Sequence, residues 1–217
     1  MNFGIIADGN RRWAKANNKP ISEGHFQGFL KLKDLILPTI QADGQFDSVT
    51  IYGFSTENWK RSPLEVLDLM KVFNKIFTQW SGELIYEKIR LIHVGRKDRL
   101  PKNLLNKIQD LEGKSSKFKE FTIYLCLDYG GQDEIVRVFN QLKIKKITSK
   151  DFEKHLEVPP LDIVFRTGGE NRLSNFCIWQ AAYAEFFFIK KKLPEIEKSD
   201  ISVILDKFRE RDRRKGE

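Results

Sequence analysis

Residues 2–13 read Asn2-Phe3-Gly4-Ile5-Ile6-Ala7-Asp8-Gly9-Asn10-Arg11-Arg12-Trp13. A short apolar run that ends in Asp-Gly-Asn is typical of a buried strand followed by a turn. Residues 11–17 then continue with a helix pattern. The stretch therefore predicts a strand, a tight turn and a helix, which is the opening unit of an α/β fold.

The same alternation of strand-like and helix-like stretches runs through the rest of the chain. Further strand-like apolar runs are found at 48–54, 89–95, 121–127, 161–165 and 185–189. Helix-like stretches are found at 22–43, 63–88, 102–112, 131–143, 173–183 and 199–211. This pattern predicts an α/β fold with a parallel central sheet of about six strands flanked by helices.

Length and composition limit the domain organisation and the class of protein. A chain of 217 residues without internal repeats or a low-complexity linker indicates one domain over 1–217, with 207–217 as a basic C-terminal tail. No run reaches about 18 consecutive apolar residues, and no signal-peptide pattern precedes the first strand, so we expect a cytoplasmic protein. Cys126 and Cys177 lie in apolar segments without metal-ligand spacing and are expected to be buried thiols.

The net charge of +8 is concentrated at the two ends of the chain. Residues 1–33 hold six basic and two acidic side chains, and the tail at 207–217 holds six basic and three acidic ones. A nucleic-acid binder, a binder of small polyanions and a protein at a membrane surface could each have this distribution. The chain contains no nucleic-acid recognition motif, so we expect no nucleic-acid partner.

Polar and basic residues follow three of the predicted strands. They form the loops Asp8-Gly9-Asn10-Arg11-Arg12-Trp13, Ser55-Thr56-Glu57-Asn58-Trp59-Lys60-Arg61 and Arg166-Thr167-Gly168-Gly169-Glu170-Asn171-Arg172-Leu173-Ser174-Asn175-Phe176. Ligands of open parallel sheets bind beyond the carboxyl ends of the strands. The three loops are therefore expected to meet at one ligand site.

The chemistry of these loops suits a phosphate or diphosphate with a divalent metal. Glycines let the backbone approach a ligand closely, helix N-termini offer free N–H groups, and arginines donate in pairs to phosphate. A single carboxylate such as Asp8 suits Mg²⁺, which favours one or two carboxylates together with phosphate oxygens. The alternative for each loop taken alone is an ordinary capping turn with solvated arginines.

Two further features have both a structural and a functional interpretation. His25, early in the helix pattern at 22–43, is either a structural histidine or part of the site. Phenylalanine is frequent, with 17 residues in the chain. Those at positions 26, 29, 54, 73, 77, 118, 121 and 139 either belong to the core or line an apolar channel for a hydrocarbon chain.

Long motifs in this chain occur in the same order in one known family. They are Asp8-Gly9-Asn10-x-Arg12-Trp13-Ala14, Gly24-His25, Tyr52-x-Phe54-Ser55-Thr56-Glu57-Asn58-Trp59-x-Arg61, Tyr129-Gly130-Gly131, Arg166-Thr167-Gly168-Gly169-Glu170-x-Arg172-Leu173-Ser174-Asn175-Phe176 and Trp179-Gln180-x-Ala182-Tyr183-x-Glu185. Over almost its whole length the chain resembles the cis-prenyltransferases, and most closely the bacterial undecaprenyl diphosphate synthases.

The resemblance implies a dimeric enzyme with a hydrophobic tunnel between sheet and helices. It implies that the chain condenses isopentenyl diphosphate repeatedly onto an allylic diphosphate, such as farnesyl or geranyl diphosphate, with Mg²⁺ as cofactor. The homodimer would have shared active sites, and the lipid product would bring the enzyme to the membrane surface as a peripheral protein. Product length is left open, since Gly53 leaves space for a long product whereas Phe77 and Phe121 could narrow the tunnel.

Site residues are carried over from the matching motifs. Asp8 would be catalytic and would bind the metal, Asn58 would take part in proton removal, and Glu185 would reach the metal from across the dimer. Substrate-binding residues would be Gly9, Asn10, Arg11, Arg12, Trp13, His25, Ser55, Thr56, Glu57, Trp59, Arg61, Arg166, Arg172, Leu173, Ser174, Arg214 and Gly216. Of these, Gly9, Asn10, Arg12 and His25 would hold the allylic diphosphate, and Arg166, Arg172 and Ser174 the isopentenyl diphosphate.

Some positions depart from the usual pattern of the family. Arg11 replaces a glycine, Ile21 an arginine, Asp128 an asparagine, Gln132 an arginine and Asn171 a histidine. Arg11 could supply the guanidinium that is missing at Ile21. Two other functions are considered, a short-chain enzyme that makes a terpenoid precursor and a non-catalytic partner subunit. Such partner subunits tend to lose the first aspartate and the motif arginines, which this chain keeps.

Overall fold

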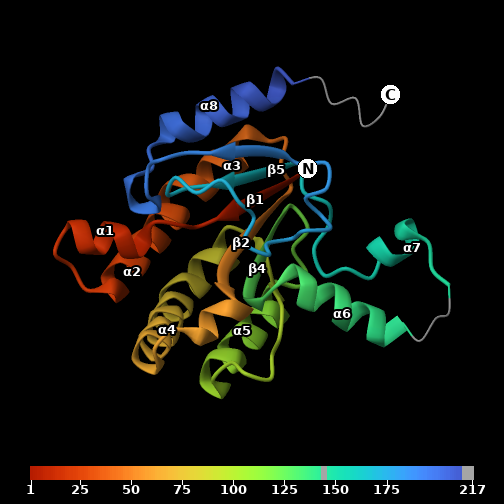
Figure 1. Cartoon of the computed structure of the whole chain (residues 1–217), viewed down its shortest axis with the longest axis horizontal. Coiled ribbons are helices and arrows are strands. Elements are labelled where there is room, and N and C mark those ends of the chain that lie inside the picture. Colours follow the sequence, from red (N-terminus) through yellow and green to blue (C-terminus); the bar gives the residue numbers. More distant parts are fainter. Residues whose placement is uncertain (143–145, 212–217) are drawn as a thin grey trace.

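The computed structural model describes residues 1–142 and 146–211. Within them, six strands form one sheet in the order β3-β4-β2-β1-β5-β6 (Figure 1). Every neighbouring pair is parallel, as predicted. The strands are β1 (Asn2–Ile6), β2 (Ser48–Ser55), β3 (Ile89–Val94), β4 (Phe121–Tyr129), β5 (Ile163–Arg166) and β6 (Glu185–Phe188).

Helices follow the strands and cover the sheet. They are α1 (Asn10–Ala16), α2 (Ile21–Lys31), α3 (Leu37–Asp43), α4 (Pro63–Tyr86), α5 (Lys102–Ser115), α6 (Gly131–Leu142), α7 (Ser149–Glu153) and α8 (Lys198–Arg209). A π-helical turn at Leu32–Ile36 joins α2 to α3, so the helix expected at 22–43 is continuous with one irregular turn. The start of α4 has the expected cap, in which Ser62 Oγ accepts the Glu65 N–H and Pro63 is the first helical residue.

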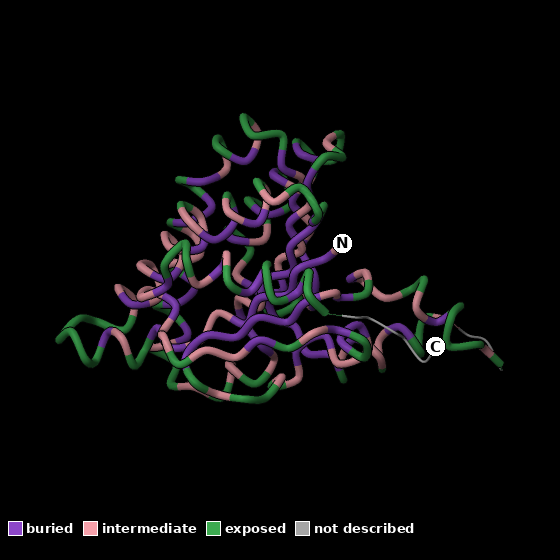
Figure 2. The backbone as a smooth tube through the Cα atoms, turned by 90° about the horizontal axis from the view of Figure 1, so that it is seen from above, coloured by how far each residue is buried: buried purple, intermediate pink, exposed green. Residues whose placement is uncertain are grey.

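The central strand β1 explains why residues 2–6 are apolar, since all five of its residues are buried. Phe3 and Ile5 face the larger core, which helices α3, α4, α5 and α8 complete. Ile6 faces a smaller core on the opposite side, which contains Cys126 and Cys177. Figure 2 shows buried residues running through the strands and exposed ones on the outer turns of the helices. Both cysteines are buried free thiols, as predicted.

The prediction of a helix at 173–183 is wrong, because this segment is a series of turns. Ser174, Asn175 and Cys177 have left-handed backbone conformations, with φ of 51°, 65° and 40°, which interrupt a right-handed helix. Their carbonyl groups are also used elsewhere in the fold. Tyr52 Oη donates to the Ser174 carbonyl at 3.1 Å, and the Gly131 N–H donates to the Asn175 carbonyl at 2.7 Å.

Two expected site residues of the C-terminal tail cannot be placed, and the possibility of a membrane-spanning helix can be checked. Arg214 and Gly216, expected to be substrate-binding residues of the tail, lie outside the described residues. Among the residues that are described, no helix is both long enough and apolar enough to span a bilayer.

Candidate active site

The carboxyl ends of β1, β2 and β5 lie side by side, so the three polar loops meet there. Ile6 at the end of β1 pairs with Tyr52 of β2 on one side and with Arg166 of β5 on the other. Asp8 follows β1 by two residues, and the turn Thr56–Lys60 follows β2 directly. The expectation that the three loops meet at one edge of the sheet is therefore confirmed.

Asp8 and Arg166 form the centre of the site. Arg166 Nη2 donates to Asp8 Oδ2 at 2.8 Å, and Arg166 Nη1 donates to Ser174 Oγ at 2.9 Å and to the Arg172 carbonyl. The Arg166 residue is only 4% exposed, so its charge is compensated chiefly within the site. The loop that follows β1 is thereby joined to the loop that follows β5.

The backbone around Asp8 is held by Thr167 and by Gly9. Thr167 Oγ1 accepts the Asp8 N–H at 3.0 Å and donates to the Asp8 carbonyl at 2.7 Å. The Gly9 N–H donates to Asp8 Oδ1 at 2.6 Å. Gly9 has a φ of 98°, which an L-residue rarely adopts, and a Cβ there would lie 2.7 Å from Lys192 Cβ. The sequence motif therefore has a steric reason for glycine after the aspartate.

Asp8 remains ionised at neutral pH. Its partial burial alone would raise the pKa, but the hydrogen bonds from Arg166 and Gly9 and the charges of Arg166 and Arg12 hold the pKa below its ordinary value. Arg12 Nη2 lies 3.3 Å from Asp8 Oδ1. The site thus presents the Asp8 carboxylate among guanidinium groups, which suits an anionic ligand that arrives with a metal ion.

Asn10 and His25 form a second polar contact at the mouth of the cavity. Asn10 Nδ2 lies 3.5 Å from His25 Nδ1. This contact depends on the close approach of α2 to α1, because a Cβ on Gly24 would lie 2.4 Å from the Asn10 carbonyl oxygen. Within the described chain, the buried atoms His25 Nε2 and Asn10 Oδ1 have no hydrogen-bond partner. Buried polar atoms without partners are costly, so His25 Nε2 indicates a ligand that supplies the missing bond, whereas Asn10 Oδ1 lies against Gly28 of α2.

His25 is neutral at physiological pH. Burial lowers its pKa from 6.5 to about 4, and the charges of Arg61 and Arg11 contribute to the same shift. A neutral imidazole can donate one hydrogen bond from Nε2 to a phosphate oxygen without bringing a charge of its own. The functional interpretation of His25 is therefore supported by its position.

We expect His25 to make stability depend on pH. Between pH 6.5 and about 4 the unfolded chain binds a proton at His25 that the folded chain does not bind. The free energy of unfolding should therefore fall as the pH drops through this range, by at most about 3 kcal/mol from this residue. Urea unfolding of the wild type and of His25→Gln at a series of pH values measures the contribution as the difference between the two curves.

The exposed His155 provides the matched control for this experiment. His155→Gln should leave the difference between neutral and acidic pH as it is in the wild type. A His25→Gln protein with the same pH dependence as the wild type would contradict the assignment.

The turn Thr56–Lys60 closes the site from the side of β2. Asn58 Oδ1 accepts the Ser55 N–H at 3.1 Å, which ties the Asn58 side chain to the end of β2. Beyond the turn, Arg61 Nη1 lies 3.1 Å from Glu65 Oε1, and Arg11 Nε lies 3.4 Å from the same atom. Arg11 is therefore placed at the mouth beside Arg61.

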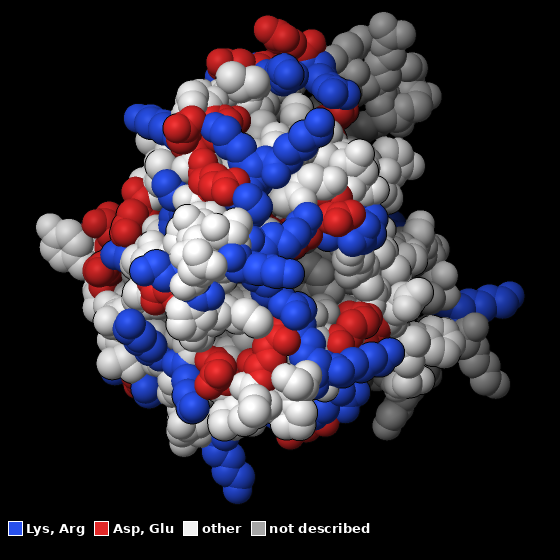
Figure 3. Space-filling model, turned by 60° about the vertical axis from the view of Figure 1, so that its left-hand side comes forward, with Lys and Arg blue, Asp and Glu red and all other residues white. Residues whose placement is uncertain are grey.

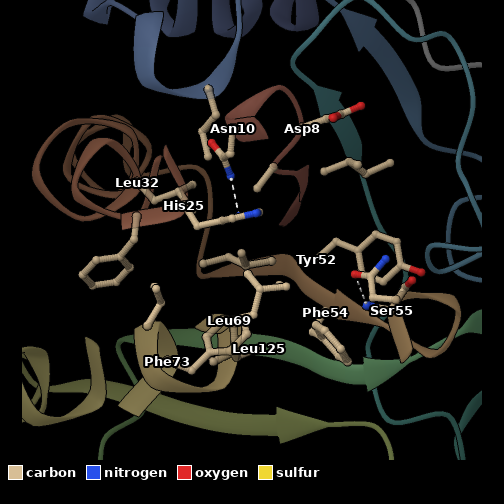
Figure 4. Close-up of a pocket in the computed structure, with 18 of the residues that line it drawn as sticks. Asp8, Asn10, His25, Leu32, Tyr52, Phe54, Ser55, Leu69, Phe73 and Leu125 are labelled. Atoms are coloured by element: carbon tan, nitrogen blue, oxygen red, sulfur yellow. Dashed lines mark hydrogen bonds between the residues drawn. The ribbon is translucent and has the colours of Figure 1, made fainter. Parts of the chain in front are cut away.

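A cavity of about 380 Å³ leads from this polar cluster into the apolar core. Figure 4 shows Asp8, Asn10 and His25 at one end and Leu69, Phe73 and Leu125 at the other. At the far end Trp80 packs edge-on against Phe29, with ring centroids 5.2 Å apart. The cavity thus has a charged mouth and an apolar interior, which suits an amphiphilic ligand with an anionic head.

Most of the phenylalanines have one of the two expected roles, but the prediction is wrong for Phe139, which neither belongs to the core nor lines the cavity. Phe29, Phe54, Phe73 and Phe77 line the cavity. Phe121 is a core residue away from it, and Phe139 is 61% exposed on α6.

Most of the expected site residues line the cavity or its mouth. They are Asp8, Gly9, Asn10, Arg11, Arg12, His25, Ser55, Asn58, Arg61, Arg166, Arg172 and Ser174. Lys15 and Lys19 also border the mouth and were not expected; Lys15 is four residues after Arg11 on α1, whereas Lys19 follows the end of that helix. Figure 3 shows Lys and Arg side chains gathered along the surface of the molecule on the side of α1 and α2.

Other expected residues do not line this space. They are Trp13, Thr56, Glu57, Trp59 and Leu173. Thr167, which holds the backbone of Asp8, was missed, although the motif around Arg166 contains it.

Glu185 is not brought to Asp8 within one chain. Glu185 is the first residue of β6 and pairs with Ile163 of β5, which in turn pairs with Phe3 of β1. These residues lie where the strands begin, whereas Asp8 lies beyond the other end of β1. Glu185 Oε2 lies 2.8 Å from an Arg211 guanidinium nitrogen.

The described part of the chain has no group of three or more His, Cys, Asp or Glu residues that could bind a metal ion without a ligand. Asp8 supplies a carboxylate at the mouth, and Glu170, which also borders the mouth, lies beside Arg12 and Arg172. Since Mg²⁺ often binds through one carboxylate, phosphate oxygens and water, this donor set fits a metal that binds together with a diphosphate.

Comparison with known proteins agrees with this geometry. A family model described as "Putative undecaprenyl diphosphate synthase" matches residues 6–216. A tritrans,polycis-undecaprenyl-diphosphate synthase (geranylgeranyl-diphosphate specific) from Pyrococcus furiosus is 39% identical over 98% of this chain and 85% of its own length. An isoprenyl transferase from Helicobacter pylori is 37% identical over 98% of this chain and 95% of its own.

Two solved structures share the whole fold. Lavandulyl diphosphate synthase from Lavandula x intermedia, in complex with dimethylallyl diphosphate, is 32% identical with a TM-score of 0.93. A probable undecaprenyl diphosphate synthase from Campylobacter jejuni is 25% identical with a TM-score of 0.86. In both cases the similarity covers 100% of this chain and 98% of the other.

Proposed function

We propose that this chain, which belongs to the undecaprenyl diphosphate synthase family, condenses isopentenyl diphosphate onto an allylic diphosphate primer to make a longer cis-prenyl diphosphate. The observation that carries the proposal is the continuous space from the arginine-lined mouth at Asp8 to the apolar cavity that ends at Trp80. An allylic diphosphate has an anionic head and a hydrocarbon tail, and each meets the matching part of this space. The homology explains why the same chain elongation is expected here.

The residues of the mouth have distinct tasks in this reaction. The C–O bond of the allylic diphosphate breaks, and the bonding electron pair leaves with the diphosphate. Arg12 and the neutral His25 would hold this leaving group at the mouth, while Arg166 and Arg172 would hold the isopentenyl diphosphate. Fixed donors stabilise the charge that develops on the leaving group, because they need no reorganisation during the step.

A metal ion fits the same arrangement. Asp8 and the diphosphate oxygens would hold Mg²⁺, which supplies positive charge that stabilises the departing diphosphate. The apolar wall formed by Phe54 and Leu69 excludes water from the allylic carbon. The double-bond electrons of the isopentenyl unit form the new carbon–carbon bond, and this unit then loses a proton, for which the released diphosphate is an acceptor. We assign Asn58 as a participant in the proton removal because this side chain lies on the cavity wall.

The proposal includes a homodimer with shared active sites. Glu185 would then act on the metal of the partner's site, in keeping with its distance from Asp8 of its own chain. Its ion pair with Arg211 would have to open for that contact. The tail with Arg214 and Gly216 would cover the substrate of the partner subunit, and the polyprenyl product would bring the dimer into peripheral contact with a membrane.

A short-chain product is the second candidate. It is favoured by the closed far end of the cavity, where Trp80 is 8% exposed and packs against Phe29. Product length therefore needs to be measured separately from the reaction class.

The test is an assay of the purified full chain with Mg²⁺, labelled isopentenyl diphosphate and each of four primers: dimethylallyl, geranyl, farnesyl and geranylgeranyl diphosphate. We expect labelled prenyl diphosphates with at least one of them, and mass spectrometry gives their length. Failure to incorporate label with all four primers would overturn the proposal.

We expect Trp80→Leu to shift the products to longer chains. The smaller side chain opens the far end of the cavity, and each additional buried methylene favours retention of the growing chain by about 0.8 kcal/mol. Mass spectrometry of the products, at equal substrate ratios, measures the shift.

Tyr86→Leu provides the control, because Tyr86 is on the same helix but 84% exposed. It should give the wild-type distribution. An unchanged distribution for Trp80→Leu would show that another part of the cavity limits the product.

A further inference from the structure

Asp128 is a fully buried carboxylate that does not line the cavity. It is 0% exposed and is the residue before the last of β4. Strand β4 is the neighbour of β2, and their ends are paired through Ser55 and Tyr129. Asp128 therefore lies next to the turn that carries Asn58 without being part of that turn.

Both oxygens of Asp128 accept hydrogen bonds from side chains. Trp59 Nε1 donates to Oδ1 at 2.9 Å, Arg99 Nε donates to Oδ2 at 2.8 Å, and Arg99 Nη2 also donates to Oδ1. A buried ion pair of this kind adds little net stability, because desolvation offsets the attraction. We therefore expect the ion pair to affect mainly the Trp59 indole, which Asp128 holds through a hydrogen bond.

Trp59 is held from three directions. Besides the bond to Asp128, the Arg99 guanidinium lies over the indole with its carbon 5.6 Å from the ring centroid. On another side Phe54 packs edge-on at 5.1 Å. Trp59 itself does not line the cavity, but the adjacent Asn58 and Phe54 do. The indole thus packs directly against Phe54 and belongs to the same turn as Asn58.

We propose that Asp128 and Arg99 are positioning residues, which hold Trp59 and through it keep Asn58 and Phe54 at the cavity wall beside the reacting carbon. The inference rests on the proposed condensation, and it assigns Asp128 and Arg99 an effect on the rate of that reaction. Small displacements of a wall that orients two reactants can cost a large part of the rate, about a hundredfold for about 1 Å.

The test is a double-mutant cycle with Asp128→Ala and Trp59→Phe. Asp128→Ala should lower kcat about tenfold, while the KM values of both diphosphates change less than about threefold. Trp59→Phe removes the indole N–H that Asp128 holds. If Asp128 acts through Trp59, adding Asp128→Ala to Trp59→Phe should cause almost no further loss of kcat.

The conservative variant Asp128→Asn distinguishes positioning from a general need for the ion pair. Its side-chain oxygen can still accept the Trp59 N–H, and Arg99, which is 38% exposed, can turn toward solvent. We expect kcat within about threefold of the wild type. Asp98→Ala is the matched control, since Asp98 is an exposed partner of Arg96 in the same loop and does not contact Trp59; it should have wild-type kinetics.

A readout without substrate separates this inference from the proposed function. The emission of Trp59 is obtained by subtracting the tryptophan emission of Trp59→Phe from that of the wild type. The same subtraction in the Asp128→Ala background gives the emission of Trp59 without its Asp128 bond, and acrylamide should quench this emission more strongly. An equal loss of kcat from Asp128→Ala in the wild-type and Trp59→Phe backgrounds, or unchanged quenching, would overturn the inference. A wild-type chain that condenses no isopentenyl diphosphate would instead overturn the proposed function.

Discussion

Asp8→Ala is expected to abolish condensation, with kcat at least about a thousandfold below the wild type. Asp8 is the carboxylate at the mouth that fits a metal brought by the diphosphate, and it fixes Arg166 through a 2.8 Å hydrogen bond. Removing it takes away both functions at once. Steady-state kinetics with saturating primer and isopentenyl diphosphate measure the loss.

Asp8→Asn separates the charge from the shape of this side chain. Alanine leaves the buried Arg166 without its counterion, and we expect about 1–3 kcal/mol lower stability in urea unfolding. Asparagine keeps an oxygen for the Arg166 bond, so its stability should lie closer to the wild type while its activity is still lost. Wild-type turnover in Asp8→Asn would show that the negative charge is not required.

Arg166→Lys is expected to lower kcat/KM for isopentenyl diphosphate about a hundredfold. Arg166 makes bonds to Asp8, Ser174 and the Arg172 carbonyl at the same time, from a side chain with little access to solvent. A single ammonium cannot reproduce this planar set of donors, so the charge is retained but the geometry is lost. Kinetics at varied isopentenyl diphosphate, with primer saturating, test the expectation.

Arg96→Lys is the control for the same chemical change at another ion pair. Arg96 pairs with the exposed Asp98, away from the cavity. Its kinetics should stay within about twofold of the wild type, since an exposed ion pair contributes little. An Arg166→Lys enzyme with unchanged kcat/KM would contradict the role given to the guanidinium.

Residues with a local physical cause were predictable from the sequence. The apolar run of β1, the positive φ that favours glycine after Asp8 and the Ser62-Pro63 start of α4 can each be read from a few neighbouring residues. The segment 173–183 shows where such reasoning fails. Its composition suits a helix, but the carbonyls of Ser174 and Asn175 are bound by Tyr52 and Gly131, which are more than 40 residues away.

The residues and contacts of the candidate site also divide into those that the sequence predicts and those that it does not. Its motifs predict Asp8, Arg166 and the residues around them as site residues, and the structure places these two side chains in contact. Three polar loops could also be located at one end of a parallel sheet from the alternation of strands and helices alone.

The amino-acid sequence alone established the α/β class, the diphosphate chemistry and the resemblance that names the reaction, since these depend on short-range patterns and on the order of motifs. Only the tertiary structure decided that β1 lies between β2 and β5, that Asp8 bonds Arg166, and that Asp128 and Arg99 hold Trp59. The bonded side chains are separated by 29 to 158 residues along the chain. Their contacts arise from the pairing order of the strands, which no local pattern of residues encodes.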